Sequence, residues 1–501
     1  MHGSYEYPEF PMSYDKYGVG PNEHIPAAVL HQYLTDYAKH FGVFDRMQFG
    51  TRLESVSPDS HDGWTVTISS AKGVGALHTK RLILATGLTS SPNCPSYAGQ
   101  ETFTSPFFHA KNFCERRETL FTSKNAVVIG GGKSAFDVAY AYTEAGVHVD
   151  LIIRPDGNGP VWLSQPFVTP LKQKMEELLH TRFLTWFSPT PWGGEDGFSL
   201  IRNFLHRTKV GQILVHTFWH LLSSGVVEDN GYDDYGSPNL AALKPWYSAF
   251  WTGSGLSIHN FDSDLFQAAR ENKITVRIAN ISHLHGNEVH LSTKDVIRAD
   301  VVVCATGWKK GPSFKFEQTD MKPSGLNDAD MDRLATAADH KILTMFPGLK
   351  DQPVLRRKPA KANPMRLYRF IVPPAFIEKR NLAFAGGISS VSTSICASIQ
   401  GLWISAYMDG KLKRFPKTAE EVIDESFLHS QWGKWRYPCG YGASIPDFAF
   451  DALPYFDLLL HDLGLKNHRK SSPMAELIEP YKPRDYAKLV SEWTGSGQSK
   501  P

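Results

Sequence analysis

The sequence predicts an α/β protein in which one domain, built on a strand–turn–helix–strand unit, interrupts a second domain. Three observations lead to this fold class. A glycine-rich turn at 130–135 follows a short apolar strand and precedes a helical segment. Two further apolar strands, at 81–87 and 300–307, both end in Ala-Thr-Gly and bracket that unit. The length of 501 residues is enough for two packed domains.

The bracketed unit is defined by its local pattern. Asn125–Ile129 is an apolar run of the kind that forms a buried strand. The turn then reads GGGKSA, which matches the pattern G-x-G-x-x-A. We expect a helix from about Ser134 to Ala145, ended by Gly146, and a second strand over Val147–Ile153. This order of elements is typical of a dinucleotide-binding fold.

Residues of the turn each have a physical role. Gly130 permits the tight turn, and Gly132 lacks the side chain that would keep the backbone away from a pyrophosphate. Ala135 lets the helix pack closely on the strand. Lys133 and Ser134 stand at the helix N-terminus, where free N–H groups bind phosphate oxygens. All of these are candidate cofactor-binding residues.

The residue at the tip of the second strand selects the cofactor. An acidic side chain there suits the ribose hydroxyl of NAD, whereas an arginine suits the 2′-phosphate of NADP. Arg154 occupies this position and favours NADP. Asp150 and Asp156 flank it and weaken that preference.

The two Ala-Thr-Gly strands mark where the chain enters and leaves the inserted domain. Thr86 with Gly87, and Thr306 with Gly307, lie at the ends of apolar strands bounded by glycine. Since a dinucleotide binds at the ends of parallel strands, these four residues are further candidates for cofactor contacts.

Domain boundaries follow from these anchors. We expect one domain made from residues 1–122 and 306–501, and an inserted domain over 123–305. The inserted domain contains an aromatic-rich helical stretch at about 156–262, which one nucleotide fold does not require. Its tryptophans are Trp162, Trp186, Trp192, Trp219, Trp246 and Trp251. Two interpretations stay open: a helical subdomain with its own core, or a wall that forms an apolar substrate pocket or a membrane-facing patch.

A segment before the glycine turn resembles the signature of a known family. Phe103–Phe113 is similar to the F-x-G-x-x-x-H-x-x-x-[FY] signature of flavin-containing monooxygenases, with Ser105 in place of the glycine and His109 at the histidine. The strand at 381–387 and the helix that carries Gln400 also resemble this family. The likeness is greatest to its fungal branch, which serves natural-product pathways.

This resemblance implies a two-dinucleotide-binding flavoprotein, in which a Rossmann-like NADP domain is inserted in an FAD domain. It implies that NADPH reduces FAD, and that the reduced flavin uses O2 to place one oxygen atom on a small organic substrate in secondary metabolism. Val56, Gly386 and Gln400 would contact FAD. We assign no catalytic side chain and no metal ligand.

The sequence departs from the family at its start. The family begins with its own strand–GxGxxG–helix for FAD, and no such segment precedes the Tyr7–Met12 stretch here. We therefore expect an FAD domain that is N-terminally incomplete. Two alternatives to a working monooxygenase remain: a catalytically silent or truncated NADP-binding homologue, and a flavin oxidoreductase that is not a monooxygenase.

Composition indicates an ordinary globular enzyme. The net charge is +2, so nothing indicates a nucleic-acid partner. The N-terminus has no apolar leader, and no apolar run reaches the ~18 residues of a membrane span. We therefore expect a cytoplasmic protein without an indicated membrane association.

The five cysteines form neither a C-x-x-C motif nor a close pair in the sequence. This pattern favours a reducing compartment and disfavours a structural zinc site. It also disfavours a disulfide reductase, which needs a redox-active cysteine pair beside its flavin.

Overall fold

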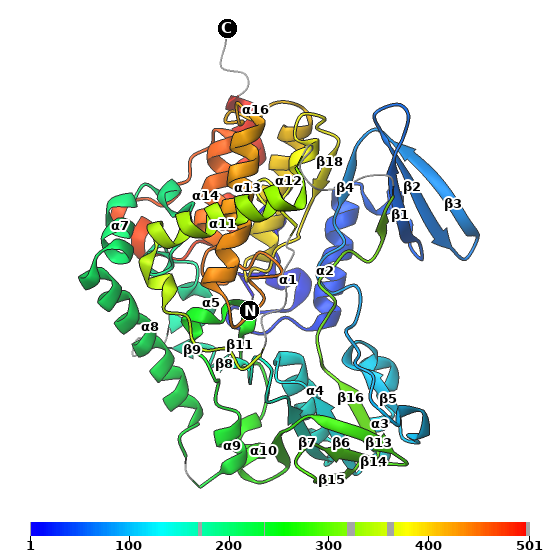
Figure 1. Cartoon of the computed structure of the whole chain (residues 1–501). Helices are drawn as coiled ribbons and strands as arrows, with labels where there is room; N and C mark the ends of the chain where they lie inside the picture. The colour runs from blue at the N-terminus through cyan, green and yellow to red at the C-terminus, as the bar shows by residue number, and fades with distance from the viewer. Residues whose placement is uncertain (1, 169–172, 235, 318–325, 358–364, 497–501) are drawn as a thin grey trace.

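The inserted domain is built on a parallel sheet with the strand order β12-β7-β6-β16-β5. The computed structural model describes residues 2–168, 173–234, 236–317, 326–357 and 365–496 (Figure 1). The strands of this sheet are β5 (Phe107–His109), β6 (Asn125–Ile129), β7 (His148–Ile153), β12 (Ile274–Ile278) and β16 (Val301–Cys304). All strand pairs recorded in it are parallel.

Helix α4 (Lys133–Glu144) connects β6 to β7, as the sequence pattern predicts. It begins at Lys133, just before the expected start, and the chain turns away at Gly146. That residue has a φ of 79°, which glycine adopts without strain. Nearly all of β6 and β7 is buried, as expected for strands covered on both faces. The predicted strand–turn–helix–strand unit is confirmed.

Two other sheets join segments from before the inserted domain with segments from after it. β4 (Leu82–Leu84) pairs in parallel with β18 (Leu382–Phe384). A further sheet has the order β17-β1-β2-β3. Its strands are β1 (Arg52–Pro58), β2 (Trp64–Ser70), β3 (Gly73–Thr79) and β17 (Lys315–Phe316). The chain therefore leaves this region after β4 and returns to it with β17 and β18.

Helices make up most of the remaining structure. Before α4 lie α1 (Tyr14–Tyr17), α2 (Ala27–His40) and α3 (Thr119–Thr122). The inserted domain adds α5 (Met175–Leu178), α6 (Arg182–Thr185), α7 (Ser199–Arg207), α8 (Lys209–Asn230), α9 (Pro238–Ala242) and α10 (Leu265–Arg270). The C-terminal part contains α11 (Asp328–Met345), α12 (Thr393–Met408), α13 (Ala419–Arg436), α14 (Ala452–Leu463), α15 (Pro473–Ile478) and α16 (Leu489–Ser496).

Short strands complete the inserted domain. They are β8 (Trp162–Ser164), β9 (Phe167–Val168), β10 (Gln173–Lys174), β11 (Leu256–Ile258), β13 (Ile281–His285), β14 (Glu288–Leu291) and β15 (Val296–Arg298). β8 pairs in parallel with β11, which places the two ends of the helical stretch side by side.

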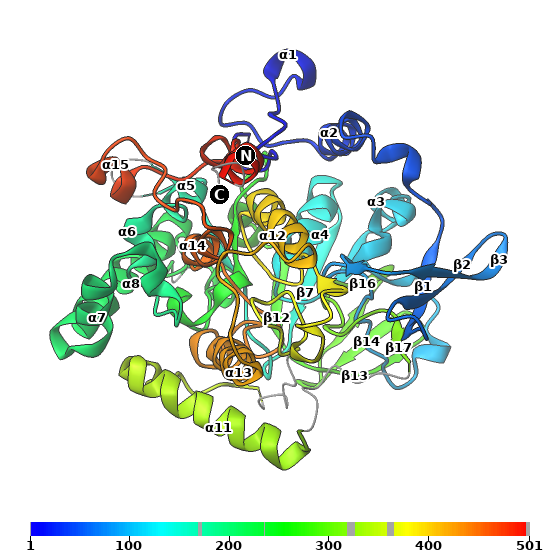
Figure 2. The ribbon, with the colours of Figure 1, turned by 90° about the horizontal axis from the view of Figure 1, so that it is seen from above.

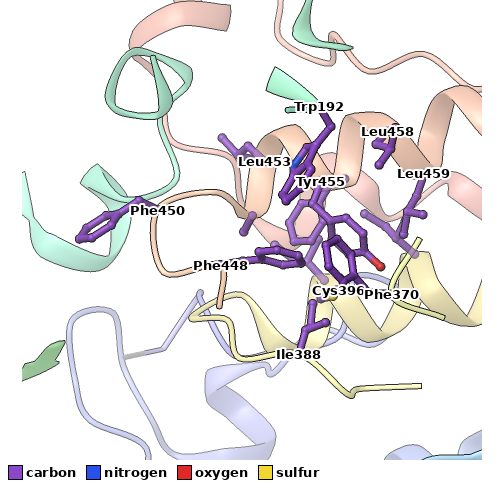
Figure 3. Packing of buried hydrophobic residues seen from close by; sticks show 14 of the residues in the cluster. Trp192, Phe370, Ile388, Cys396, Phe448, Phe450, Leu453, Tyr455, Leu458 and Leu459 are labelled. Carbon is purple, nitrogen blue, oxygen red and sulfur yellow. The ribbon is translucent and has the colours of Figure 1, made fainter. Parts of the chain in front are cut away.

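The aromatic stretch at 156–262 shares its core with the C-terminal helices. Trp192 packs its ring against Phe370 and Phe448, both at 5.5 Å between ring centroids, and Phe448 lies 4.8 Å from Tyr455 of α14 (Figure 3). Trp219 of α8 lies in the same cluster. The interpretation of a helical subdomain with its own core is therefore wrong. The aromatic residues of this stretch pack at the interface between the insertion and the C-terminal helices.

Buried ion pairs fix this interface. Arg182 of α6 is 1% exposed and donates to Asp457 of α14 at 2.5 and 3.0 Å and to Glu476 of α15 at 2.5 Å. Figure 2 shows α14 beside the insertion helices α6 and α8. Because a buried charge is costly unless it is paired, these three side chains fix the relative position of their helices.

α8 is, among the described residues, a helix long and apolar enough to span a membrane by length and composition. Its most apolar window has a mean hydropathy of 1.2, and 22% of that window is buried. The sequence analysis did not find such a run. Length and composition are weak support for a span, and Val215, Trp219 and Val226 of α8 are buried inside the protein.

Replacing Arg182 by methionine should leave the carboxylates of Asp457 and Glu476 buried without their cation. We expect Arg182→Met to lower the free energy of unfolding by about 3–5 kcal/mol. The matched control Arg207→Met, at an exposed position of α7, should change it by less than about 0.5 kcal/mol. Urea denaturation followed by tryptophan fluorescence measures both. Equal effects of the two substitutions would contradict the assigned role.

The neutral imidazole of His206 should make the protein sensitive to acid. His206 donates through Nε2 to the carbonyl oxygen of Trp186 at 2.9 Å, and burial lowers its pKa from 6.5 to about 3. Below pH 6.5, His206 binds a proton in the unfolded chain, whereas its imidazole in the folded protein stays neutral until the pH approaches the lowered pKa. Stability is therefore lost as the pH falls, by up to about 1.4 kcal/mol per pH unit from this residue.

His206→Gln should reduce that acid-induced loss, and His216→Gln, at an exposed position of α8, should leave it unchanged. The measurement is the urea midpoint at about pH 7.5 and about pH 5, on either side of the ordinary histidine pKa. The same pH dependence in both variants would show that His206 does not carry the effect.

Candidate active site

A cleft of about 720 Å³ opens at the carboxyl ends of the parallel strands of the inserted domain. This is the edge at which open α/β sheets bind their ligands. Seven of the sequence-predicted residues line it: Gly130, Gly132, Lys133, Ser134, Arg154, Thr306 and Gly307. The structure thus brings the glycine turn, the tip of β7 and the second Ala-Thr-Gly segment to one place.

Glycines of the turn are required by close contacts. Gly130 has a φ of 143°, and a Cβ there would lie 2.4 Å from the carbonyl oxygen of Ala305. A Cβ on Gly131 would lie 2.7 Å from the carbonyl oxygen of Gly159. A Cβ on Gly132 would meet no atom within 4 Å, so this residue borders open space in the cleft. Sequence reasoning gave Gly131 no role, because its neighbour Gly159 comes from a distant turn.

The side chains of Lys133 and Ala135, next to the glycine turn, make contacts within the protein. Lys133 contacts Asp137, donates to Asn260 at 2.6 Å and lies 4.3 Å from the centre of the Phe261 ring. Ala135 is fully buried behind the turn, where it allows the close approach of α4 to the sheet. The N-terminus of α4 therefore faces the cleft with its backbone N–H groups.

Arg154 lies exposed at the rim of the cleft. Asp150 is buried instead, and its carboxylate accepts a hydrogen bond from Nε of Arg277 on β12 at 2.6 Å. Its charge is therefore already paired inside the sheet. The expectation that Asp150 weakens the preference for a 2′-phosphate loses its physical basis.

His109 of the family-like signature lies at the side of the cleft. Nε2 of its ring donates to the carbonyl oxygen of Gly307 at 3.0 Å, and Nδ1 accepts from the backbone of Lys111 at 3.1 Å. Burial lowers the pKa of this imidazole, so the neutral form is favoured. Ser105, which replaces the signature glycine, donates to the carbonyl oxygen of Ala299 at 2.7 Å. His109 is thus a positioning residue for the Gly307 turn.

The other predicted cofactor residues lie outside this cleft, around the β4–β18 pair. Gly87 and Gly386 follow those two strands by three and two residues, and both have a φ of 66°. The Gln400 side chain is 1% exposed; its Oε1 accepts from the backbone of Gly386 and its Nε2 donates to Tyr455, both at 2.9 Å. Val56 is fully buried in β1. Thr86 precedes Gly87 in the turn that follows β4.

These residues fit only the edge of an FAD site. Gly87 and Gly386 give two adjacent backbone turns at the carboxyl ends of paired parallel strands. Of the residues that the structure describes, no strand–glycine turn–helix like that at 130–135 lies beside them.

The C-terminal segment supplies a side of the cleft that the sequence analysis missed. Lys310 lies 4.0 Å from the centre of the Tyr441 ring, and both line the cleft. Behind them, the Asp447 carboxylate accepts from the backbone and hydroxyl of Ser254 at 2.8 and 2.7 Å. Burial lowers the pKa of Lys310 and raises that of Asp447 to about 6. In the sequence, the one feature that could have indicated Lys310 as a cleft residue is its position shortly after the second Ala-Thr-Gly segment.

Two cysteines that are distant in the sequence meet beside the cleft. The thiols of Cys94 and Cys304 share a hydrogen bond, and both cysteines are free. The statement that the cysteines form no close pair holds for the sequence but is wrong for the fold. Burial raises the pKa of Cys304 well above its usual range, which disfavours the thiolate that redox chemistry requires.

The sequence is similar to known oxidoreductases. A family model described as pyridine nucleotide-disulphide oxidoreductase matches residues 12–181. The FAD-dependent monooxygenase resA of Aspergillus sclerotiorum is 31% identical, with 100% of this chain and 89% of that protein covered. An FAD-dependent monooxygenase of Pyrenophora dematioidea is 32% identical, with 95% and 90% covered.

Solved structures share the fold. The open crystal structure of cyclohexanone monooxygenase superimposes with a TM-score of 0.56 at 14% identity, covering 98% of this chain and 88% of that one. Cyclohexanone monooxygenase from Rhodococcus sp. Phi1 bound to NADP+ gives 0.54 at 16% identity, covering 91% and 87%. The predicted α/β fold with two dinucleotide-binding domains is confirmed.

That the FAD domain is N-terminally incomplete stays a prediction. The family resemblance itself does not depend on it, because the alignments to the two fungal relatives cover nearly all of this chain at more than 30% identity. The glycine-turn cleft, the shared architecture and these relatives agree: the chain belongs to the FAD-dependent monooxygenase family.

Proposed function

We propose that this protein is an FAD- and NADPH-dependent monooxygenase that transfers one oxygen atom from O2 to a small organic substrate in secondary metabolism. The observation that carries the proposal is the 720 Å³ cleft, in which the glycine turn and Arg154 face one space, in a chain of this family. The names of the fungal relatives support the oxygen-transfer reaction and the need for FAD.

NADPH would bind in this cleft with its pyrophosphate at the N-terminus of α4. The open space beside Gly132 admits the phosphates, and the N–H groups at Lys133 and Ser134 bind their oxygens. Arg154 would pair with the 2′-phosphate through a charged, two-pronged contact. Lys310, on the far side, adds a second cation to a site that binds an anion.

FAD would bind at the second site, with contacts from Thr86, Gly87 and Gly386. Val56 and Gln400, which the sequence also suggested, are buried and would support these turns from behind. Thr306 and Gly307 lie in the NADPH cleft and would face the space between the two cofactors. Bound FAD supplies the chemistry that activates O2, and the protein's residues bind and orient the two cofactors. In this arrangement residues 1–122 and 306–501 form the FAD domain and 123–305 the NADP domain, except that β5 (Phe107–His109) pairs with β16 and so belongs to the sheet of the NADP domain.

A catalytically silent NADP-binding homologue is the second candidate. It is favoured by one observation, that the described residues around β4 and β18 offer no pyrophosphate cradle. A disulfide reductase finds less support, because burial keeps the Cys304 thiol protonated. We place the enzyme in the cytoplasm, where its free cysteines stay reduced, with the substrate and O2 as partners and no nucleic acid.

The nucleotide assignment predicts a specific effect of two substitutions. Gly132→Val puts a branched side chain into the open space of the cleft and should abolish NADPH binding. Arg154→Ala should weaken NADPH binding by about 1.5–3 kcal/mol, the range for a hydrogen bond to a charged group, and leave NADH binding nearly unchanged. Isothermal titration with both nucleotides is the measurement. Equal weakening of NADPH and NADH by Arg154→Ala would show that the arginine does not read the phosphate.

Because the second site is assigned to FAD, we expect this 501-residue chain to bind FAD weakly. The purified protein should retain less than one FAD per chain after gel filtration, because the described residues around β4 and β18 offer no glycine turn and helix N-terminus like those at 130–135 to neutralise the pyrophosphate. The visible flavin spectrum measures this, and stoichiometric FAD would overturn the prediction.

Oxygen transfer itself is tested with excess FAD, NADPH and labelled O2. The monooxygenase incorporates one labelled atom into an organic acceptor such as an aryl sulfide. NADPH that binds but is never oxidised would favour the silent homologue instead.

A further inference from the structure

The side of helix α8 that faces solvent is apolar. Val210, Ile213 and Leu221 are 61%, 64% and 66% exposed, and Leu214 is exposed beside them. Their spacing along the chain places these four side chains on one face of the helix. From Val210 to Val227 the helix carries no Asp, Glu, Lys or Arg side chain. Because a surface helix normally presents charged side chains to water, this face suits a contact with a non-aqueous partner.

Helix α7 extends this apolar surface. Leu200 of α7 is 84% exposed. Thr208 alone separates α7 from α8, and Gly211 packs so closely on Phe204 that a Cβ would overlap the carbonyl oxygen of that residue. The exposed apolar residues of the two helices form what we call the α7–α8 patch: Leu200, Ile201, Phe204, Val210, Ile213, Leu214 and Leu221. A cluster of this kind marks a contact with a protein or a membrane.

The opposite side of α8 is fixed to the body of the protein. Val215, Trp219 and Val226 are buried in the core that the insertion shares with the C-terminal helices. The Trp219 indole also donates to the carbonyl oxygen of Phe187 at 2.9 Å. The helix therefore cannot cross a bilayer without leaving this core. Figures 1 and 2 both show α7 and α8 at the outer edge of the molecule, where the patch can reach a surface.

The charges that border the patch are positive. Arg207 and Lys209, at the junction of α7 and α8, are exposed, and in the part of the chain that the structure describes neither forms an ion pair. The last acidic residues before α7, Glu195 and Asp196, are each paired with an arginine. The next acidic residue, Glu228, comes only at the far end of α8. The patch thus has free cations at one end and an acidic group at the other.

This charge pattern favours a bilayer over a second copy of the chain. A two-fold dimer apposes the same surface of both copies. It would gather the Arg207 and Lys209 side chains of both copies around one apolar contact, whereas the patch itself holds no acidic side chain to pair with them. An anionic lipid surface supplies the opposite charge together with an apolar interior.

We propose that the α7–α8 patch docks this protein on the surface of a bilayer that contains anionic lipids. The apolar side chains enter the boundary between headgroups and acyl chains, as in other interfacial helices, and Arg207 and Lys209 contact the headgroups. Glu228 stays in water, so α8 lies tilted, with its N-terminal half deeper. This contact requires no spanning segment, and it fits a cytoplasmic enzyme because cytoplasmic leaflets carry anionic lipids. It does not depend on the proposed oxygen transfer.

The direct test is flotation of the purified protein with phosphatidylcholine vesicles that contain about 30% phosphatidylserine. The wild type should float with the vesicles. The double variant Ile213→Glu/Leu221→Glu should lower the bound fraction about tenfold, because it forces two carboxylates against the apolar boundary. The matched control Val74→Glu/Phe121→Glu changes two exposed apolar positions outside the patch and should bind like the wild type. An unbound wild type, or equal binding by the two double variants, would overturn the proposal.

The role of the two cations is tested with the same vesicles. Arg207→Gln/Lys209→Gln should lower binding about tenfold when phosphatidylserine is present and leave the weaker binding to pure phosphatidylcholine unchanged. The control Lys72→Gln/Lys80→Gln removes two exposed lysines that lie on either side of β3 and should bind like the wild type. The same loss in both double variants would show that only net charge matters and would contradict this docking geometry.

Leu200→Glu, at the most exposed position of the patch, repeats the flotation test if Ile213→Glu/Leu221→Glu folds poorly. Sedimentation velocity without vesicles tests the alternative occupant, and a monomeric wild type is expected. A wild-type dimer that dissociates in the Ile213→Glu/Leu221→Glu variant would assign the patch to a second copy of the chain and overturn the lipid proposal.

Discussion

The contact between the aromatic insertion and the C-terminal helices supports the nucleotide cleft of this protein. Its fixed points are the buried pairs of Arg182 with Asp457 and Glu476. Each buried charge excludes alternative packings, because a displaced helix would leave an unpaired ion in an apolar surrounding. The aromatic rings of the insertion then fill the space between fixed helices, and the described residues of the insertion share this core with the C-terminal helices.

The nucleotide cleft depends on this contact as well as on its own glycine turn. Lys310 and Tyr441 close one side of it, and Asp447 ties Ser254 of the insertion to the same C-terminal segment. A loosened interface would therefore open the cleft even with the glycine turn intact. The βαβ unit supplies the phosphate site, and the tertiary contact supplies the enclosure that keeps water away from a reaction.

The chemistry of the nucleotide cleft suits an anionic ligand. The cleft combines a helix N-terminus with Arg154 and Lys310, which is an environment for an anionic nucleotide.

The sequence by itself determined the local parts: the strand–turn–helix–strand unit at 125–153, its glycines and the tip residue Arg154. Such features depend on backbone conformation and on side-chain periodicity within a few residues, and a short segment of sequence carries both. The paired Ala-Thr-Gly strands likewise predicted the inserted arrangement. Only the tertiary structure decided that Asp150 is neutralised by Arg277, that Cys94 meets Cys304, and that Lys310, Tyr441 and Asp447 complete the cleft. These contacts join residues that are far apart in the chain, and their existence depends on how whole helices and sheets pack, for which a single sequence contains no local signal.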